Sequence, residues 1–205
     1  MVMAEATNHY FKHLGVSDGL SQVCIPSIYQ DELGAVWLGT TEGLNRYNGK
    51  DVKVFQPSES NHGLTNNEIN ELCGDKNGRM YIRSGNDLIK LDIYTEQFTC
   101  LRQKGVYGLF CKKDTLWVSC ADGIYYYTGQ GTELTFFARV QKGFVGRALY
   151  VDKETVWVVT RKYLVAISRE DPLRQEILLT LDKGNCILGD SSGNIWVGAW
   201  NGLYR

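Results

Sequence analysis

The chain has 205 residues, of which 43% are hydrophobic and 12% aromatic, so it is long enough to bury a core of ordinary size. Its formal net charge of −1 provides no concentrated basic face, which excludes nucleic acid and direct membrane contact as expected partners of this segment. No apolar run approaches about 18 residues, and the first ten residues contain no hydrophobic stretch, so we expect neither a membrane span nor a signal peptide here.

One sequence unit recurs along the chain. The stretch from Gly19 to Leu38 returns without a gap 44 residues later, from Gly63 to Ile82. Five copies can be aligned on one aromatic residue each, and these are Trp37, Tyr81, Trp117, Trp157 and Trp196. The intervals of 44, 36, 40 and 39 residues match the length of one propeller blade. The chain is therefore predicted to be an array of about five repeats.

Each copy divides into four short strands. In the first copy, a strand at about 24–30 ends in the turn formed by Asp31 and Gly34, and a second strand covers 36–40. A turn at 41–43 leads to a third strand, and Asn48-Gly49, a strong hairpin signal, leads to a fourth at 52–55. Four strands joined by turns predict an all-β fold, a β-propeller of four-stranded antiparallel blades.

The two ends of the array look complementary. We expect residues 1–15 to form an N-terminal segment in which about 8–15 supply an orphan outer strand, while 16–205 form the propeller. The predicted blades are about 16–56, 60–100, 104–138, 145–180 and 184–205, and the last one contains only three strands. Either the N-terminal strand completes a closed five-blade ring, or the chain is a fragment of a larger propeller. Both alternatives stay open at this point.

Residues that keep the phase of the repeat are assigned to structure. The aligned aromatics are expected to fill the space between blades, and the turn aspartates lack the companion carboxylates that calcium requires. The three histidines, His9, His13 and His62, are expected to be solvated, and no nucleophile, phosphate-loop or paired-cysteine motif is present. We therefore predict no metal, no cofactor and no enzymatic activity for this chain.

Six cysteines are present, with no Cys-x-x-Cys spacing that would indicate zinc; they are Cys24, Cys73, Cys100, Cys111, Cys120 and Cys186. We expect small buried thiols, since free cysteine is often buried. The alternative is a disulfide between Cys111 and Cys120 across neighbouring strands.

A ligand site is expected where residues depart from the repeat. In a propeller, the turns between second and third strands and the segments between blades open on the same face, around the channel mouth. The residues at these turns that fit a ligand are Trp200, Asn201, Arg161, Lys162 and Glu42. An aromatic ring beside amide and guanidinium groups suits a sugar, which has an apolar face and hydroxyls at its edge. The alternatives are that Trp200 packs under a loop and that Arg161 and Lys162 are solvated charges.

The first copy resembles a known repeat. It follows the pattern Ile-x-x-Asp-x-x-Gly-x-Val-Trp-Leu-Gly-Thr-x-x-Gly-Leu-x-Arg-Tyr from Ile28 to Tyr47, and this pattern resembles the two-component regulator propeller repeat. The preceding segment from Phe11 to Ser21 resembles the opening of the periplasmic sensor region in hybrid two-component systems of gut Bacteroidetes.

This resemblance implies a periplasmic sensor module of a hybrid histidine kinase that responds to oligosaccharides and regulates glycan-utilisation genes through the parent protein. It also implies a seven-blade propeller, further signalling domains in the parent chain, and an oligosaccharide or a second copy of the chain as partners. Two other classes are kept as alternatives. They are a polysaccharide-active propeller lyase or hydrolase, and a protein-interaction or dimerisation scaffold.

Overall fold

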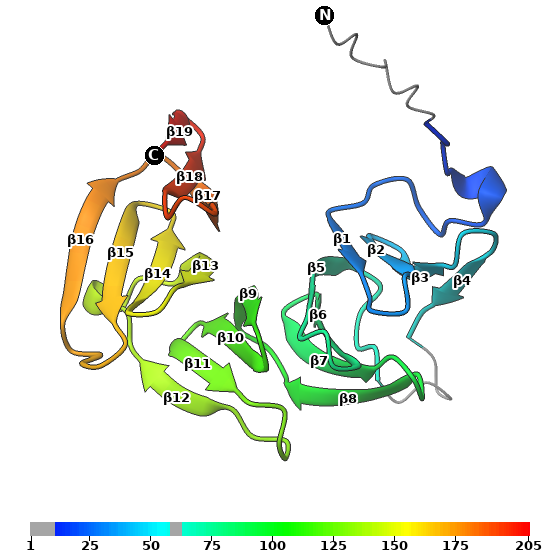
Figure 1. Cartoon of the computed structure of the whole chain (residues 1–205), viewed down its shortest axis with the longest axis horizontal. Coiled ribbons are helices and arrows are strands. Elements are labelled where there is room, and N and C mark those ends of the chain that lie inside the picture. The colour runs from blue at the N-terminus through cyan, green and yellow to red at the C-terminus, as the bar shows by residue number, and fades with distance from the viewer. Residues whose placement is uncertain (1–10, 58–62) are drawn as a thin grey trace, which may run out of the picture.

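The computed structural model describes residues 11–57 and 63–205, which form five antiparallel sheets placed along an open arc (Figure 1). Besides strands, the described residues contain two short 3-10 helices, η1 (Val16–Asp18) and η2 (Gln141–Gly143). The prediction of an all-β propeller architecture is confirmed. In the described part of the chain, no helix has the length and apolar character needed to cross a membrane.

Each sheet is a meander of strands in chain order, and we call it a blade. Blade one contains β1 (Ser27–Gln30), β2 (Val36–Thr40), β3 (Gly43–Tyr47) and β4 (Val52–Phe55). Blade two contains β5 (Ile69–Gly74), β6 (Arg79–Ser84), β7 (Asp87–Asp92) and β8 (Gln97–Arg102). Blade three contains β9 (Val106–Lys112), β10 (Thr115–Cys120), β11 (Gly123–Tyr127) and β12 (Thr135–Ala138). Blade four contains β13 (Gly146–Val151), β14 (Thr155–Thr160), β15 (Tyr163–Ser168) and β16 (Gln175–Thr180), and blade five contains β17 (Gly184–Gly189), β18 (Ile195–Ala199) and β19 (Gly202–Tyr204).

The first strands of successive blades contact one another along the arc, from β1 through β5, β9 and β13 to β17. The second-strand aromatics lie between blades, where Trp37 and Tyr81 are fully buried and Trp117 is 5% exposed. Trp157 and Trp196 are half-buried. The assignment of these aromatics to packing is therefore supported most strongly in the first three blades.

The turn aspartate holds the neighbouring tryptophan. The buried Asp31 carboxylate accepts the backbone N–H groups of Leu33 (3.0 Å) and Ala35 (2.9 Å) and the indole Nε1–H of Trp37 (2.7 Å). The same carboxylate–indole bond recurs in two later blades, between Asp152 and Trp157 at 2.7 Å and between Asp190 and Trp196 at 2.8 Å. One residue thus closes the turn and orients the core aromatic, which explains why both keep the phase of the repeat.

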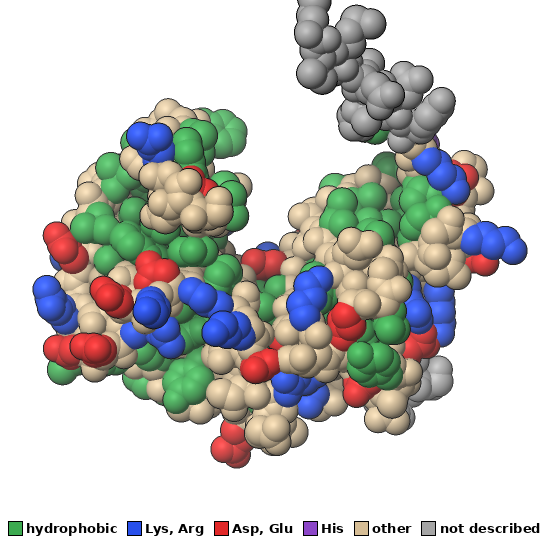
Figure 2. Space-filling model, in the orientation of Figure 1, with side chains coloured by type: hydrophobic (Ala, Val, Ile, Leu, Met, Phe, Trp, Pro, Cys, Tyr) green, Lys and Arg blue, Asp and Glu red, His purple; other side chains and the backbone are tan. Residues whose placement is uncertain are grey.

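Both ends of the arc present apolar side chains that are covered in the inner blades (Figure 2). Leu44 of blade one is fully buried, whereas Leu203, at the same place in blade five, is 69% exposed. Leu72 of blade two is 7% exposed, whereas the matching Ile28 of blade one is 64% exposed. Of the orphan strand expected at about 8–15, residues 11–15 contain no strand, and 8–10 lie outside the described residues. A five-blade ring closed by that strand is therefore not observed.

The cysteines differ from the expectation of buried thiols. Only Cys120 is buried, while Cys24 and Cys186 are exposed. Cys111 and Cys120 do not face each other, because Cys111 pairs with Leu116 and Cys120 pairs with Val106 at the other end of the β9–β10 hairpin. The antiparallel register separates them, so a disulfide between these two residues is excluded by the strand pairing.

Candidate functional site

A β-bulge near the start of the first strand recurs in blades two to five. In each case the strand register skips one residue, so that this residue has no partner on the second strand. The skipped residues are Asn70, Tyr107, Arg147 and Asn185. A bulge bends its strand and re-aims the side chain of the extra residue. The fold therefore offers one variable side chain per blade at equivalent positions.

Backbone hydrogen bonds place the turns beside the segments between blades. Gly184 N–H donates to the carbonyl of Arg161 (3.1 Å), and Leu181 N–H donates to that of Lys162 (2.6 Å). Trp200 N–H donates to the carbonyl of Asp182 (2.9 Å). Because these bonds join the β14–β15 turn, the β16–β17 segment and the β18–β19 turn, the three lie on one face of blades four and five.

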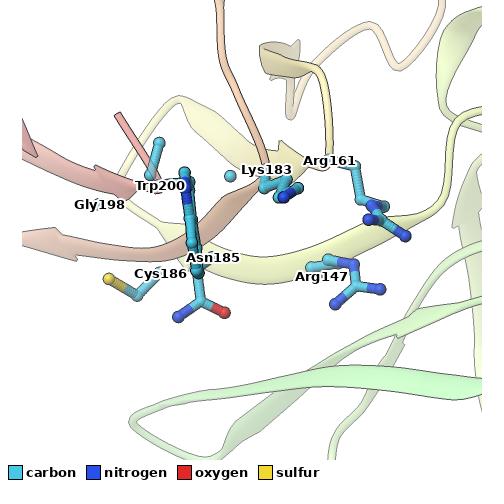
Figure 3. A pocket seen from close by; sticks show the side chains of 9 residues that line it. Arg147, Arg161, Lys183, Asn185, Cys186, Gly198 and Trp200 are labelled. Carbon is cyan, nitrogen blue, oxygen red and sulfur yellow. The ribbon is translucent and has the colours of Figure 1, made fainter. Parts of the chain in front are cut away.

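Two hollows meet on this face. One, of about 450 Å³, is lined by Arg147, Arg161, Lys183, Asn185, Cys186 and Trp200, together with small residues (Figure 3). The other, of about 340 Å³, is lined by Tyr107, Phe144, Arg147, Arg161 and Lys162, among others. Arg147 and Arg161 border both hollows. We call the combined surface the blade-four groove.

The blade-four groove is basic and has aromatic rings at its two ends. Trp200 is 78% exposed at one end, with the Lys183 Nζ 4.7 Å from its ring centroid, and Tyr107 is 36% exposed at the other. Figure 3 shows Arg147 and Arg161 extending from neighbouring segments with their guanidinium groups on the same side. No carboxylate lines either hollow. None of the ion pairs found among the described residues involves a groove cation.

Blade two places a paired charge near its own bulge. The Glu71 carboxylate accepts the backbone N–H of Leu109 at 3.1 Å and lies 3.5 Å from the Arg83 Nε. Burial raises the pKa of Glu71 to about 7, while Arg83 and the Leu109 N–H act in the opposite direction. The Arg83 guanidinium is thus paired with a carboxylate of its own blade, whereas the arginines of the blade-four groove have no such partner among the described residues.

The structure brings three of the five predicted site residues together. Trp200 and Arg161 line the larger hollow, and Lys162 lines the smaller hollow beside Arg161. Asn201 is exposed in the β18–β19 turn but lines neither hollow. Glu42 lies in blade one, at the other end of the arc, where its carbonyl accepts the Gln56 side chain at 2.8 Å.

Among the groove residues that were not predicted from the sequence are four polar or aromatic ones that matter most for binding, namely Tyr107, Arg147, Lys183 and Asn185. Three of them, Tyr107, Arg147 and Asn185, are bulge residues, and the repeat pattern carries no signal that marks a bulge. As for metals, the described residues contain no group of three or more His, Cys, Asp or Glu side chains that could hold an ion. His13 is exposed as expected, whereas His9 and His62 lie outside the described residues.

A family model described as a two-component regulator propeller matches residues 19–42, which include the Asp31 turn and the core Trp37. This stretch, at the start of blade one, therefore matches one two-component regulator propeller repeat. A histidine kinase, P4 of Formosa agariphila, is 40% identical over 53 residues, a stretch that covers 26% of this chain and 4% of that protein.

Solved structures share the fold of these propeller repeats. The extracellular domain of one hybrid two-component system from B. thetaiotaomicron superposes with a TM-score of 0.81 at 23% identity, covering 94% of this chain and 30% of that one. A second such domain from the same organism gives 0.68 at 22% identity, covering 86% and 25%. A gluconolactonase from Xanthomonas campestris gives 0.64 at 13% identity, covering 86% and 69%. The chain thus spans less than a third of the length of these two extracellular domains.

Proposed function

We propose that this chain is part of the extracytoplasmic sensor region of a hybrid two-component histidine kinase and binds an oligosaccharide at the blade-four groove. In this proposal the parent protein is anchored in the inner membrane, the propeller lies in the periplasm, and ligand binding regulates glycan-utilisation genes. The propeller repeats and the likeness to extracellular domains of two-component systems support the assignment to a sensor.

The observation that carries the binding proposal is the composition of the groove. Trp200 offers an exposed aromatic face, and Asn185, Arg147 and Arg161 offer hydrogen-bond donors beside it. A sugar ring places its C–H groups against an aromatic face and its hydroxyls against polar groups. The groove is concave and open, which suits a chain of sugars rather than a small enclosed ligand.

Binding is favoured over catalysis by the residues that line the groove. Hydrolysis or elimination on a glycan needs an acid and a base near the scissile bond, most often a pair of carboxylates. Neither hollow is lined by Asp, Glu or His. The gluconolactonase shares the fold at 13% identity, and this likeness carries no statement about the chemistry of the present chain.

A scaffold role is the second candidate, and the exposed apolar faces at both ends of the arc favour it. Leu203 and Ile28 are at equivalent places to residues that pack against a neighbouring blade elsewhere in the chain. A partner seated on these faces would bury them as the inner blades bury Leu44 and Leu72.

A thermal-shift screen against a panel of neutral and acidic oligosaccharides tests the proposal. We expect at least one glycan to raise the unfolding temperature, and the shift to be lost in Trp200→Ala. Leu173→Ala is the control, because Leu173 is 91% exposed in the β15–β16 connection, at the opposite end of the strands. If no glycan changes the unfolding temperature, the scaffold role replaces ligand binding as the better assignment.

A further inference from the structure

The blade-four groove contains more positive charge than a neutral sugar requires. Arg147, Arg161, Lys162 and Lys183 come from three separate segments: the β13 bulge, the β14–β15 turn and the β16–β17 segment. The chain as a whole has a net charge of −1, so this concentration is local. Four cations that converge without a carboxylate repel one another, and a bound anion relieves that repulsion.

The geometry of the two arginines suits an anionic group. Arg147 is held at its bulge by the surrounding backbone, where the Gly146 carbonyl accepts the Ser119 hydroxyl at 2.9 Å and the Arg147 carbonyl lies against Gly108. Arg161 is tied by its carbonyl to Gly184 N–H. These contacts fix the backbone from which the two side chains extend, and the two guanidinium groups lie on the same side of the groove (Figure 3). A carboxylate or a sulfate placed between them can accept paired N–H donors from both.

We propose that the ligand of the blade-four groove is an acidic oligosaccharide, with a carboxylate or sulfate bound between Arg147 and Arg161 and sugar rings placed toward Trp200 and Tyr107. This inference rests on the proposed oligosaccharide-binding function and names the class of glycan. Lys162 and Lys183 flank the arginine pair, so a second acidic sugar next to the first is also matched by a cation.

Calorimetric titration of the purified chain with matched trisaccharides tests the inference. Trigalacturonate and trigalactose differ at the carboxylate, and a sulfated galactan trisaccharide carries sulfate in its place. We expect an acidic trisaccharide to bind, the neutral one to bind at least tenfold more weakly, and 1 M salt to weaken the acidic complex because it screens surface charges. The uronate and sulfate arms distinguish the two sources of negative charge.

Variants assign the binding to the arginine pair. Arg147→Gln and Arg161→Gln should each weaken acidic-glycan binding about tenfold, as expected for the loss of a charge-assisted hydrogen bond. Arg174→Gln is the matched control, because Arg174 is an exposed arginine of the same blade in the β15–β16 connection. Equal binding of trigalacturonate and trigalactose would overturn the acidic class and leave the sensor proposal standing. If none of the three trisaccharides binds, both the acidic class and the oligosaccharide-binding proposal are overturned.

A separate observation concerns two cysteines on neighbouring first strands. Cys73 of β5 and Cys111 of β9 are half-buried, and their Sγ atoms are 2.7 Å apart. This separation is far shorter than an ordinary contact between two thiols, and the strands that carry them already pack side by side. We infer that Cys73 and Cys111 form a disulfide that joins blade two to blade three.

The reaction is an exchange with a small disulfide such as oxidised glutathione. One cysteine thiolate attacks a glutathione sulfur and releases one glutathione thiolate. The second cysteine then attacks the mixed disulfide and releases the other, so two cysteine thiols are oxidised while one glutathione disulfide is reduced to two thiols. Burial raises the pKa of the Cys73 thiol, with Cys111 as the next cause, so the exchange is best run at alkaline pH.

Peptide mapping of the chain after incubation with oxidised glutathione tests this pair. We expect one linked peptide containing Cys73 and Cys111, and an unfolding temperature that falls on reduction. Cys73→Ser should abolish both effects, whereas Cys100→Ser, a change at another half-buried cysteine of blade two, should preserve them. Full alkylation of Cys73 and Cys111 after oxidation, or a link from either residue to another cysteine, would overturn the assignment.

Discussion

Replacing Asp31 by alanine tests the role of the turn aspartate in the repeat. The substitution removes the acceptor of three donors, the backbone N–H groups of Leu33 and Ala35 and the indole N–H of Trp37. Ala35 is 6% exposed and Trp37 fully buried, so water cannot readily replace the carboxylate at these two donors. Leu33 is 56% exposed, so its N–H can be solvated.

The magnitude follows from the two buried donors. A buried polar group left without a partner costs about 1–3 kcal/mol, so two such donors cost about 2–6 kcal/mol. Some relaxation of the turn is expected, and we take about 3 kcal/mol as the working value. For a chain of this size, that loss lowers the unfolding temperature by about 6–12 °C.

Urea unfolding followed by circular dichroism measures this loss. Asp51→Ala is the control, because Asp51 is an exposed aspartate of the Asn48–Asp51 turn in the same blade. Trp37→Phe in a double-mutant cycle isolates the carboxylate–indole bond, and we expect a coupling of about 1 kcal/mol or more. A loss below about 1 kcal/mol for Asp31→Ala, equal to that of the control, would refute the structural role assigned to the turn.

Three further changes test individual packing and charge contacts. The hydrogen bond from the Trp196 indole N–H is the main cause that lowers the pKa of Asp190 from 3.8 to about 2. The ionised Asp190 therefore stabilises the fold above about pH 4, and this contribution is lost as the pH falls toward 2. Asp190→Asn should flatten this acid dependence of stability in urea titrations. Gly39→Val should lower the free energy of unfolding by about 1–3 kcal/mol, and the unfolding temperature with it, because a Cβ at this position lies 2.8 Å from the Ile69 Cγ2. Burial raises the pKa of Glu71 from 4.5 to about 7, so wild-type stability should fall as the pH rises through that range, and Glu71→Gln should remove the fall.

Each of these changes has a clear contrary result. An acid dependence that Asp190→Asn leaves unaltered would show that other carboxylates dominate it. Gly39→Val should destabilise the chain more than Thr41→Val in the adjacent turn, and equal effects would contradict the close approach of blades one and two. A stability that is flat between pH 4.5 and 7 in the wild type would contradict the raised pKa of Glu71.

The blades could be predicted from sequence because their signals are local. Alternating strands, Asp-x-x-Gly turns and one aromatic per copy each depend on residues within a few positions of one another. The bulges could not be predicted this way, since a strict period of two assigns every residue a face and a partner. Tyr107, Arg147 and Asn185 have no partner, and this is what places them in the groove.

Contacts between blades were also beyond the sequence pattern. Cys73 and Cys111 are brought together by the packing of two first strands, whereas the sequence favoured buried thiols and offered Cys111 with Cys120 only as an alternative. The register of the β9–β10 hairpin separates the latter pair. Lys183 likewise reaches Trp200 only because the segment before blade five is bonded to the β18–β19 turn.

A comparison of equivalent positions in the blades shows which groove variants report on ligand binding alone. In blades one, three and four, the position two residues after the core aromatic packs against the next first strand, as Gly39 does on Ile69 and Val159 does on Gly184. Gly198 holds this position in blade five, where no first strand covers it among the described residues. Gly198 and Trp200 line the same hollow, so a loss of binding in a Trp200 variant does not separate a ligand in the groove from a molecule that covers this open face. Arg147 and Arg161 instead lie where the next blade is already present, and a loss of binding in their variants therefore reports on the ligand itself.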